Sequence, residues 1–170
     1  MDDIVVIDNF LTKEELEQVQ NKNCYKDSYW EIHNSNSKLE DDVIDFNTPF
    51  LSKNLLDNEY YNSYLFNKIK KFFNQDYKLK DVYLNGHEGL RNGSFHIDGD
   101  ADRTVILYVT PWEPAWGGFT QFMKSERDHV IVPPILGRLV NFRSDIIHKA
   151  YAFCNQNCPM RITVAFKLLL

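Results

Sequence analysis

Apolar and polar positions follow two different patterns along this chain, and the change between them falls near residue 80. Before it, Ile4-Val5-Val6-Ile7 is a short apolar run that predicts a buried strand. Thr12-Lys13-Glu14-Glu15 then has the pattern of a helix capping box, which predicts a helix to about Asn21. A second helix is predicted from residue 59 to residue 75, where apolar side chains recur at three- and four-residue steps: Tyr61, Leu65, Ile69, Phe72 and Phe73.

Residues 22–58 lie between the two predicted helices and are rich in Asn, Asp and Ser, with a few aromatics that include Tyr29 and Trp30. A long polar excursion of this kind is typical of a lid or a substrate-facing loop. It is equally compatible with a surface loop anchored by its aromatic side chains. Both interpretations stay open at this point.

From Asp81 onward, short apolar runs alternate with Gly and Pro. They predict strands at residues 82–84, 104–109, 119–123, 129–132, 138–142 and 161–168. Strands this close together, with no helix-period run between them, indicate an antiparallel double sheet or barrel. At 170 residues we expect one domain, mostly β with some helix (α+β), in which residues 1–80 supply helical support and a lid-like loop and residues 81–170 form the β core.

Composition and charge narrow the range of functions. The chain is 44% apolar and 25% charged, as in ordinary soluble proteins. Its net charge is −5, and no block of Lys and Arg is interleaved with aromatics, so a nucleic-acid partner is not favoured. No apolar run approaches the roughly 18 residues of a membrane span, and the start MDDIVVID is unlike a signal peptide. We expect a cytoplasmic protein without a membrane partner.

Three cysteines are too few for a disulfide scaffold. Cys154 and Cys158 have the spacing of a metal or redox pair, but no second pair completes a tetrahedral set. We therefore expect them to be loop thiols.

His96 and Asp98 stand out because they are polar residues at the entrance to the apolar run 104–109. In a strand, residues i and i+2 point to the same face, so the two side chains would project together. A bare carboxylate inside a sandwich is costly unless it is paired or binds a cation. A metal would satisfy it; the alternatives are a His–Asp hydrogen bond at the rim of a sheet, or two exposed loop residues.

A third ligand would complete the set of two histidines and one carboxylate that leaves three open positions on non-haem iron. His33 lies in the polar excursion and His87 in a Gly-rich turn, so both are predicted at the surface, and His129 is predicted at the solvent end of a strand. His148 is better placed, because it follows a predicted strand and a short break that together could return the chain alongside His96. We infer that His148 completes the set.

The last predicted strand, MRITVAFKLLL, adds a cation. Alternation places Arg161, Thr163 and Ala165 on one of its faces. Arg161 could pair a carboxylate bidentately, with the Thr163 hydroxyl as a second donor. A dicarboxylic cosubstrate fits, with one end chelating the metal and the other meeting Arg161. The alternative for Arg161 is a surface ion pair with an aspartate.

Taken in order, His96-x-Asp98, YVTPWEPAWGGFTQF, VPPILGRLVNFRSDIIH and RITVAF resemble the Fe(II)- and 2-oxoglutarate-dependent dioxygenases, specifically the prolyl-4-hydroxylase-like group. The resemblance covers about residues 81–168, and the opening IVVIDNFLTKEEL is similar to that group's usual start. It implies a double-stranded β-helix (jelly-roll) core supported by N-terminal helices. It also implies the roles of seven residues: iron ligands His96, Asp98 and His148; the distal 2-oxoglutarate carboxylate partner Arg161 with Thr163; and cosubstrate contacts Tyr108 and Tyr83.

The activity implied by the resemblance is hydroxylation of a substrate C–H bond with Fe(II), 2-oxoglutarate and O2, with release of succinate and CO2; ascorbate is a further possible cofactor. A prolyl residue in a peptide or protein is the leading substrate, and a small molecule is the other substrate class. Two alternatives remain: a non-catalytic jelly-roll binding module, and a cupin-like metalloenzyme that does not use 2-oxoglutarate.

The chain departs from the family pattern at two places. Phe119 stands where the family usually has Glu, in Gly117-Gly118-Phe119-Thr120, so the contacts of that loop are expected to differ. The gap from His148 to Arg161 is also longer than usual.

Overall fold

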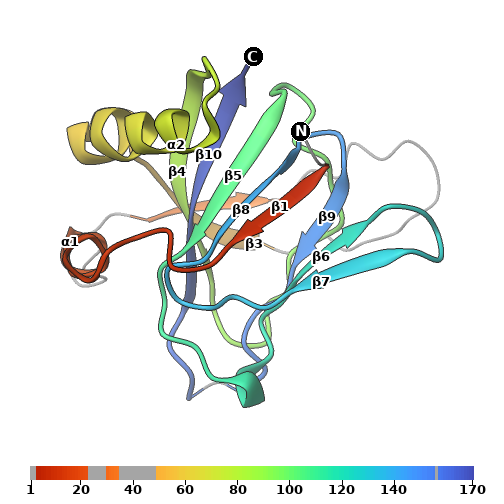
Figure 1. Cartoon of the computed structure of the whole chain (residues 1–170). Coiled ribbons are helices and arrows are strands. Elements are labelled where there is room, and N and C mark those ends of the chain that lie inside the picture. The colour runs from red at the N-terminus through yellow and green to blue at the C-terminus, as the bar shows by residue number, and fades with distance from the viewer. Residues whose placement is uncertain (1–2, 23–29, 35–48, 156) are drawn as a thin grey trace.

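Two antiparallel sheets face each other in the computed structural model (Figure 1), which describes residues 3–22, 30–34, 49–155 and 157–170. The larger sheet has the strand order β1-β8-β5-β10-β4-β3-β2, and the smaller has the order β7-β6-β9. In chain order, the elements are β1 (Ile4–Ile7), α1 (Lys13–Lys22), β2 (Glu31–Asn34), β3 (Pro49–Asn54), a π-helix (Tyr60–Leu65), α2 (Phe66–Phe73), β4 (Lys78–His87), β5 (Arg103–Tyr108), a 3₁₀ turn (Pro114–Trp116), β6 (Thr120–Met123), β7 (His129–Val132), β8 (Leu139–Arg143), β9 (Ile147–Ala150) and β10 (Arg161–Leu169).

The predicted N-terminal helices are confirmed. Helix α1 begins with the expected capping box: the Thr12 main-chain N donates to Glu15 Oε2 at 2.7 Å, and the Glu15 main-chain N donates to Thr12 Oγ1 at 3.3 Å. The second predicted helix forms as the π-helix and α2 together, and it ends at Asn74, which adopts the left-handed conformation common after a helix.

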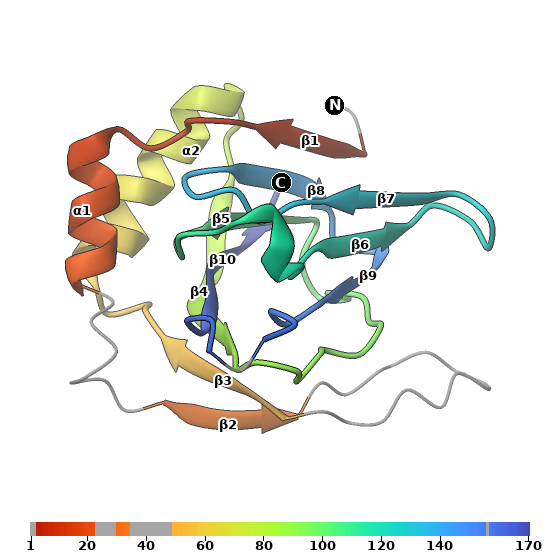
Figure 2. The same ribbon diagram turned by 90° about the horizontal axis from the view of Figure 1, so that it is seen from below.

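Strand β10 lies at the centre of the large sheet and separates two interiors. Its Ile162, Val164, Phe166 and Leu168 side chains pack into the cluster that includes α1 and α2, and complete burial of each contributes roughly 1.5–3 kcal/mol. The opposite face of the sheet looks towards β6, β7 and β9 (Figure 2). The mostly β jelly-roll core with supporting helices is therefore confirmed.

The prediction of a continuous loop over residues 22–58 was wrong in part, because β2 and β3 pair with each other and β3 pairs with β4. Strand β2 is an edge strand and β3 lies next to it, and both contain polar residues (Glu, Asn, Ser and Lys) that obscure the apolar alternation by which strands are recognised in a sequence. Most of the lid-like segment, including Tyr29, lies outside the described residues.

Within the described part of the chain, no helix is long and apolar enough to cross a membrane. Cys154 and Cys158 are free thiols in the loop before β10, as expected of loop thiols, while Cys24 lies outside the described residues.

Candidate metal centre and adjoining cavity

Main-chain pairing brings the two predicted histidine ligands together. The His96 N donates to the His148 O at 3.0 Å, and the His148 N donates to the His96 O at 2.9 Å. Two residues later, the Asp98 N donates to the Ser144 O at 2.8 Å. His148 lies on β9 and is paired on its other side with Phe122 of β6. The segment that carries His96 and Asp98 is thus fixed beside β9 by an isolated bridge and does not form a regular strand.

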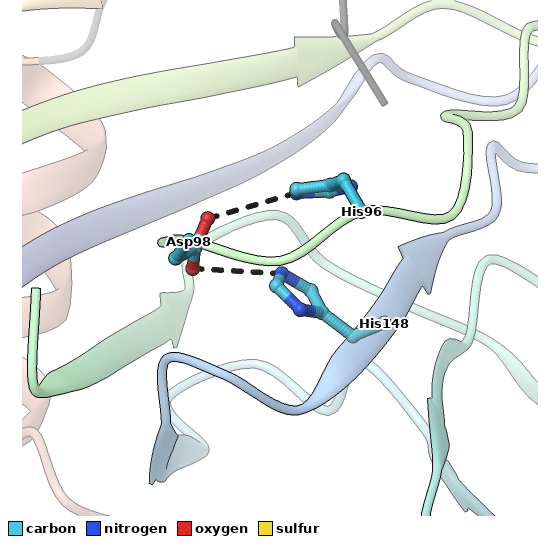
Figure 3. A group of neighbouring side chains, drawn as sticks. All are labelled: His96, Asp98 and His148. Carbon is cyan, nitrogen blue, oxygen red and sulfur yellow. Dashed lines mark ion pairs between the residues drawn. The ribbon is translucent and has the colours of Figure 1, made fainter. Parts of the chain in front are cut away.

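The three side chains point towards one another (Figure 3). His96 Nε2 lies 3.7 Å from Asp98 Oδ1, and His148 Nε2 lies 3.6 Å from Asp98 Oδ2. One potential ligand atom from each residue falls within 4.8 Å of the other two. Elsewhere in residues 3–22, 30–34, 49–155 and 157–170, no other three His, Cys, Asp or Glu residues come together in this way.

Each imidazole is oriented by a carbonyl oxygen two residues before it in the chain. His96 Nδ1 is 2.9 Å from the Ser94 O, and His148 Nδ1 is 2.9 Å from the Ile146 O. Because a carbonyl oxygen can only accept a hydrogen bond, Nδ1 carries the proton in both rings. Nε2 is therefore the nitrogen of each ring that is left to bind a metal, as in histidine ligands whose other nitrogen is held by a carbonyl.

The charges at this centre suit a cation. Burial lowers the pKa of His148 to about 4, against the opposing effect of Asp98, so the imidazole is neutral at physiological pH. Burial of Asp98 works in the other direction, but His148, Lys167 and His96 outweigh it and hold the pKa of the carboxyl well below its usual range. The centre thus offers a carboxylate and, in His148, a neutral imidazole, which are the protonation states required for metal binding.

Two further side chains, neither of them predicted from the sequence, hold Asp98. The Thr104 hydroxyl donates to Asp98 Oδ2 at 2.7 Å, and the Lys167 ammonium makes a short ion pair with the same oxygen. Lys167 also donates to Thr104 Oγ1 at 3.3 Å. The predicted alternation along the last strand, extended two residues beyond Ala165, would have placed Lys167 on this face.

A cavity of about 210 Å³ adjoins the three residues. One wall of it is formed by alternate positions of two neighbouring strands: Tyr83, Asn85 and His87 of β4, and Arg161, Thr163, Ala165 and Lys167 of β10. The metal centre lies near the Lys167 end of this row, and Arg161 is at the other end.

Arg161 is almost completely buried and is held from behind. Its Nε donates to the Gly118 O at 2.8 Å, and its Nη2 donates to Thr120 Oγ1 at 2.8 Å. Gly118 has a φ of +77°, and a Cβ there would come within 2.4 Å of the Phe153 ring, so only glycine allows this carbonyl its position. The departure at Phe119 therefore does not prevent the loop from contacting Arg161.

The two tyrosines named by the resemblance lie in different places. Tyr108 is fully buried beneath Arg161, whose guanidinium carbon is 5.4 Å from the ring centroid, and its hydroxyl donates to Thr120 Oγ1 at 2.7 Å. Tyr83 lines the cavity at the metal end, where Lys167 Nζ is 5.7 Å from the centroid of its ring. The Thr163 side chain lines the cavity two residues from Arg161.

The prediction that His87 lies at the surface was wrong. His87 is 7% exposed, stacks on Phe50 and lines the cavity. Burial, with a further contribution from Arg161, lowers its pKa to about 3. Gly86 had suggested a turn, but it belongs to β4: a Cβ there would lie 2.8 Å from the Met160 sulfur, so this glycine permits close packing within a strand.

Asn85 is a further cavity residue that was not predicted from the sequence. Its Oδ1 is buried and has no hydrogen-bond partner among the described residues. A buried amide group without a partner costs free energy, about 1–3 kcal/mol, which a polar ligand in the cavity would offset.

These features fit the groups implied by the sequence. Two imidazole nitrogens and a carboxylate oxygen are the donor set of non-haem iron with open positions. The guanidinium of Arg161, the Thr163 hydroxyl and the Asn85 amide surround the opposite part of the cavity, as a second, carboxylate end of a bound ligand requires.

No family model matches the sequence, and no curated protein matches it. Solved structures do match. A prolyl hydroxylase from Trichoplax adhaerens, in complex with a hypoxia inducible factor oxygen degradation domain peptide fragment, is 17% identical with a TM-score of 0.74, over 99% of this chain and 84% of that one. A viral collagen prolyl hydroxylase from Paramecium Bursaria Chlorella virus-1, in a 2OG complex, is 16% identical with a TM-score of 0.73, over 98% and 96% of the two chains.

A third similar structure is a non-heme alpha ketoglutarate-dependent epimerase from nogalamycin biosynthesis, 11% identical with a TM-score of 0.73, over 99% of this chain and 76% of that one. The fold is therefore that of the 2OG-Fe(II) oxygenases, prolyl hydroxylases among them. The resemblance inferred from the sequence motifs is confirmed at the level of the fold.

Proposed function

We propose that this protein is an Fe(II)- and 2-oxoglutarate-dependent oxygenase that hydroxylates a substrate C–H bond in a prolyl residue of a peptide or protein. The observation that carries the proposal is the placement of two sites in one cavity: the His96, Asp98 and His148 ligand atoms at one end, and the buried Arg161 at the other. A dicarboxylate that chelates a metal through one end and meets a guanidinium with the other needs this arrangement.

The chain's own groups have distinct tasks in this reaction. His96 and His148 would hold Fe(II) through Nε2, because their Nδ1 atoms are committed to main-chain carbonyls. Asp98 would supply the charged ligand. Bound Fe(II), with 2-oxoglutarate and O2, supplies the oxidising power to hydroxylate a C–H bond and releases succinate and CO2.

At the opposite end, Arg161 would bind the distal carboxylate of 2-oxoglutarate, aided by the Thr163 hydroxyl. Tyr108 would act indirectly. Its hydroxyl and Arg161 Nη2 both donate to Thr120 Oγ1, and this shared contact holds the guanidinium in place. Tyr83 would contact the ligand nearer the metal. The buried setting of the cavity strengthens each of these interactions relative to water.

Prolyl hydroxylation is the leading reaction because two similar folds belong to prolyl hydroxylases, one of them bound to a peptide fragment. The likeness to an epimerase means that the fold by itself leaves the reaction open, so substrate identity needs a direct test.

The test is to incubate the protein with Fe(II), 2-oxoglutarate, O2 and ascorbate on an array of proline-containing peptides, then measure succinate and peptide mass. A peptide that gains one oxygen atom in step with succinate supports the proposal. The His96→Ala variant should form neither product. If the folded protein neither binds Fe(II) nor consumes 2-oxoglutarate, the oxygenase proposal is wrong; if it produces succinate without modifying any peptide, only the prolyl substrate is wrong.

A further inference from the structure

The two carboxylate oxygens of Asp98 have different surroundings. Oδ2 accepts a hydrogen bond from the Thr104 hydroxyl at 2.7 Å and an ion pair from Lys167. Oδ1 faces His96 Nε2 at 3.7 Å, too far for a hydrogen bond. Oδ2 also lies 3.6 Å from His148 Nε2, but with Thr104 and Lys167 on it this oxygen anchors the carboxylate, and Oδ1 is the less occupied oxygen for a metal.

A lysine is an unexpected anchor at this position. Lys167 is only 8% exposed, and it lies on the cavity face of β10 among Asp98, Thr104 and Tyr83. Taking an ammonium group out of water is costly, and the Asp98 carboxylate offsets that cost. The same ammonium, however, repels any divalent cation that binds to Asp98 Oδ1.

The charge balance at the metal end follows directly. The Asp98 carboxylate and the Lys167 ammonium cancel each other, and imidazoles that ligate a metal through Nε2 add no charge, so the protein groups around a bound ion sum to zero. With a divalent cation bound, the net charge of this end of the cavity is therefore +2. Without the Lys167 ammonium, the Asp98 carboxylate would lower that net charge to +1. The carboxylate by which a 2-oxo acid chelates the ion would remove one of these two charges, whereas water ligands would remove none.

We propose that Lys167 makes metal binding depend on the dicarboxylate: the divalent ion binds weakly alone and tightly once a dianionic 2-oxo acid chelates it. This inference rests on the proposed function, and it assigns Lys167 as a positioning residue that acts through Asp98. It distinguishes Lys167 from Arg161, whose charge lies at the far end of the cavity and favours the ligand without opposing the metal.

The test is anaerobic calorimetric titration of Mn²⁺ into the full-length protein, with and without saturating 2-oxoglutarate. The ratio of the two metal dissociation constants is the coupling factor. In Lys167→Met, Mn²⁺ alone should bind about tenfold more tightly than in the wild type, and the coupling factor should fall by a similar amount. Lys167→Arg, which keeps the charge, should retain a coupling factor close to that of the wild type.

A matched control is Lys68→Met, which removes a lysine paired with Glu15 on the helical side of the large sheet. It should change neither constant. Should Lys167→Met fail to fold, Lys167→Gln supplies a neutral side chain that can still donate a hydrogen bond to Asp98, and the same result is expected.

Tighter binding of Mn²⁺ alone with a reduced coupling factor supports the inference. Unchanged or weaker binding of Mn²⁺ by folded neutral variants overturns it, because Lys167 would then only hold Asp98 in place. A wild-type protein that binds no Mn²⁺ even with 2-oxoglutarate overturns the proposed function as well.

Discussion

Arg161 and Tyr108 converge on one atom: both donate a hydrogen bond to Thr120 Oγ1, at 2.8 and 2.7 Å. Because Thr120 belongs to β6 and the other two belong to β10 and β5, this contact ties the small sheet to the large one directly behind the cavity. The guanidinium is consequently fixed before any ligand arrives, which lowers the entropy that binding has to overcome.

The fixed guanidinium leads to the first prediction. Arg161→Lys should weaken 2-oxoglutarate binding at least about tenfold, because a lysine cannot reproduce the two directed N–H contacts to Gly118 and Thr120 while also meeting a carboxylate. The measurement is a titration of 2-oxoglutarate in the presence of Mn²⁺. Mn²⁺ binding alone should stay close to that of the wild type.

A suitable control for Arg161 is Arg138→Lys. Arg138 makes a similar pair of contacts to Asp8 away from the cavity, so its loss should leave 2-oxoglutarate affinity unchanged. Equal affinities in the Arg161 and Arg138 variants would mean that the distal carboxylate binds elsewhere.

Asp98→Asn should abolish metal binding and also destabilise the fold. The substitution removes the charged ligand and leaves the Lys167 ammonium buried without its counter-ion, which costs about 3 kcal/mol. Urea unfolding measures the stability change, and calorimetry with Mn²⁺ measures the metal. Asp76→Asn, at an exposed ion pair with Lys70, is the comparison and should change neither quantity appreciably. A fully stable Asp98→Asn protein would show that Lys167 finds another partner.

Asn85→Leu should separate stability from function. The substitution removes a buried oxygen that has no partner among the described residues, so the free energy of unfolding should be unchanged or higher, by about 1 kcal/mol. If the amide serves the ligand, the same variant should bind 2-oxoglutarate several-fold more weakly. A variant that loses stability and keeps its affinity would show that Asn85 has a packing role only.

The parts of this site that could be predicted share one property: their pattern is local. His96 and Asp98 are two residues apart, and Arg161 and Thr163 alternate within one strand, so each pair could be interpreted from spacing alone. His148 could be placed because the break before it marks a returning strand. The pairing of His148 with His96 then follows from β9.

The residues that were missed depend on packing between distant segments. A glycine such as Gly86 is typical of a turn, yet Gly86 lies inside β4. Glycine is needed there because the Met160 and Trp30 side chains leave no room for a Cβ. With Gly86 assigned to a turn, neither Asn85 nor His87 could be placed on the cavity face. Lys167 was missed because a lysine near the end of a strand is usually exposed, and only the position of Asp98 explains its burial.

His87 leads to the final prediction, on pH. Above its ordinary pKa of 6.5 the imidazole is neutral in the folded and unfolded chains alike. As the pH falls below 6.5, the unfolded chain takes up a proton that the folded chain refuses until about pH 3, so stability must decrease with falling pH over that window. Burial of His148, whose pKa is about 4, acts in the same direction. Each group contributes a slope of about 1.4 kcal/mol per pH unit.

His87→Phe, which keeps a ring stacked on Phe50, should therefore reduce the slope by about that amount between roughly pH 6 and pH 4, as measured by urea unfolding at several pH values. At pH 7.5 His87 is neutral in both states, so the change in the free energy of unfolding of His87→Phe at that pH measures only the packing effect of the new ring. If the slope of the variant equalled that of the wild type, His87 would be open to protonation in the folded state, and the cavity would be wetter than its burial implies.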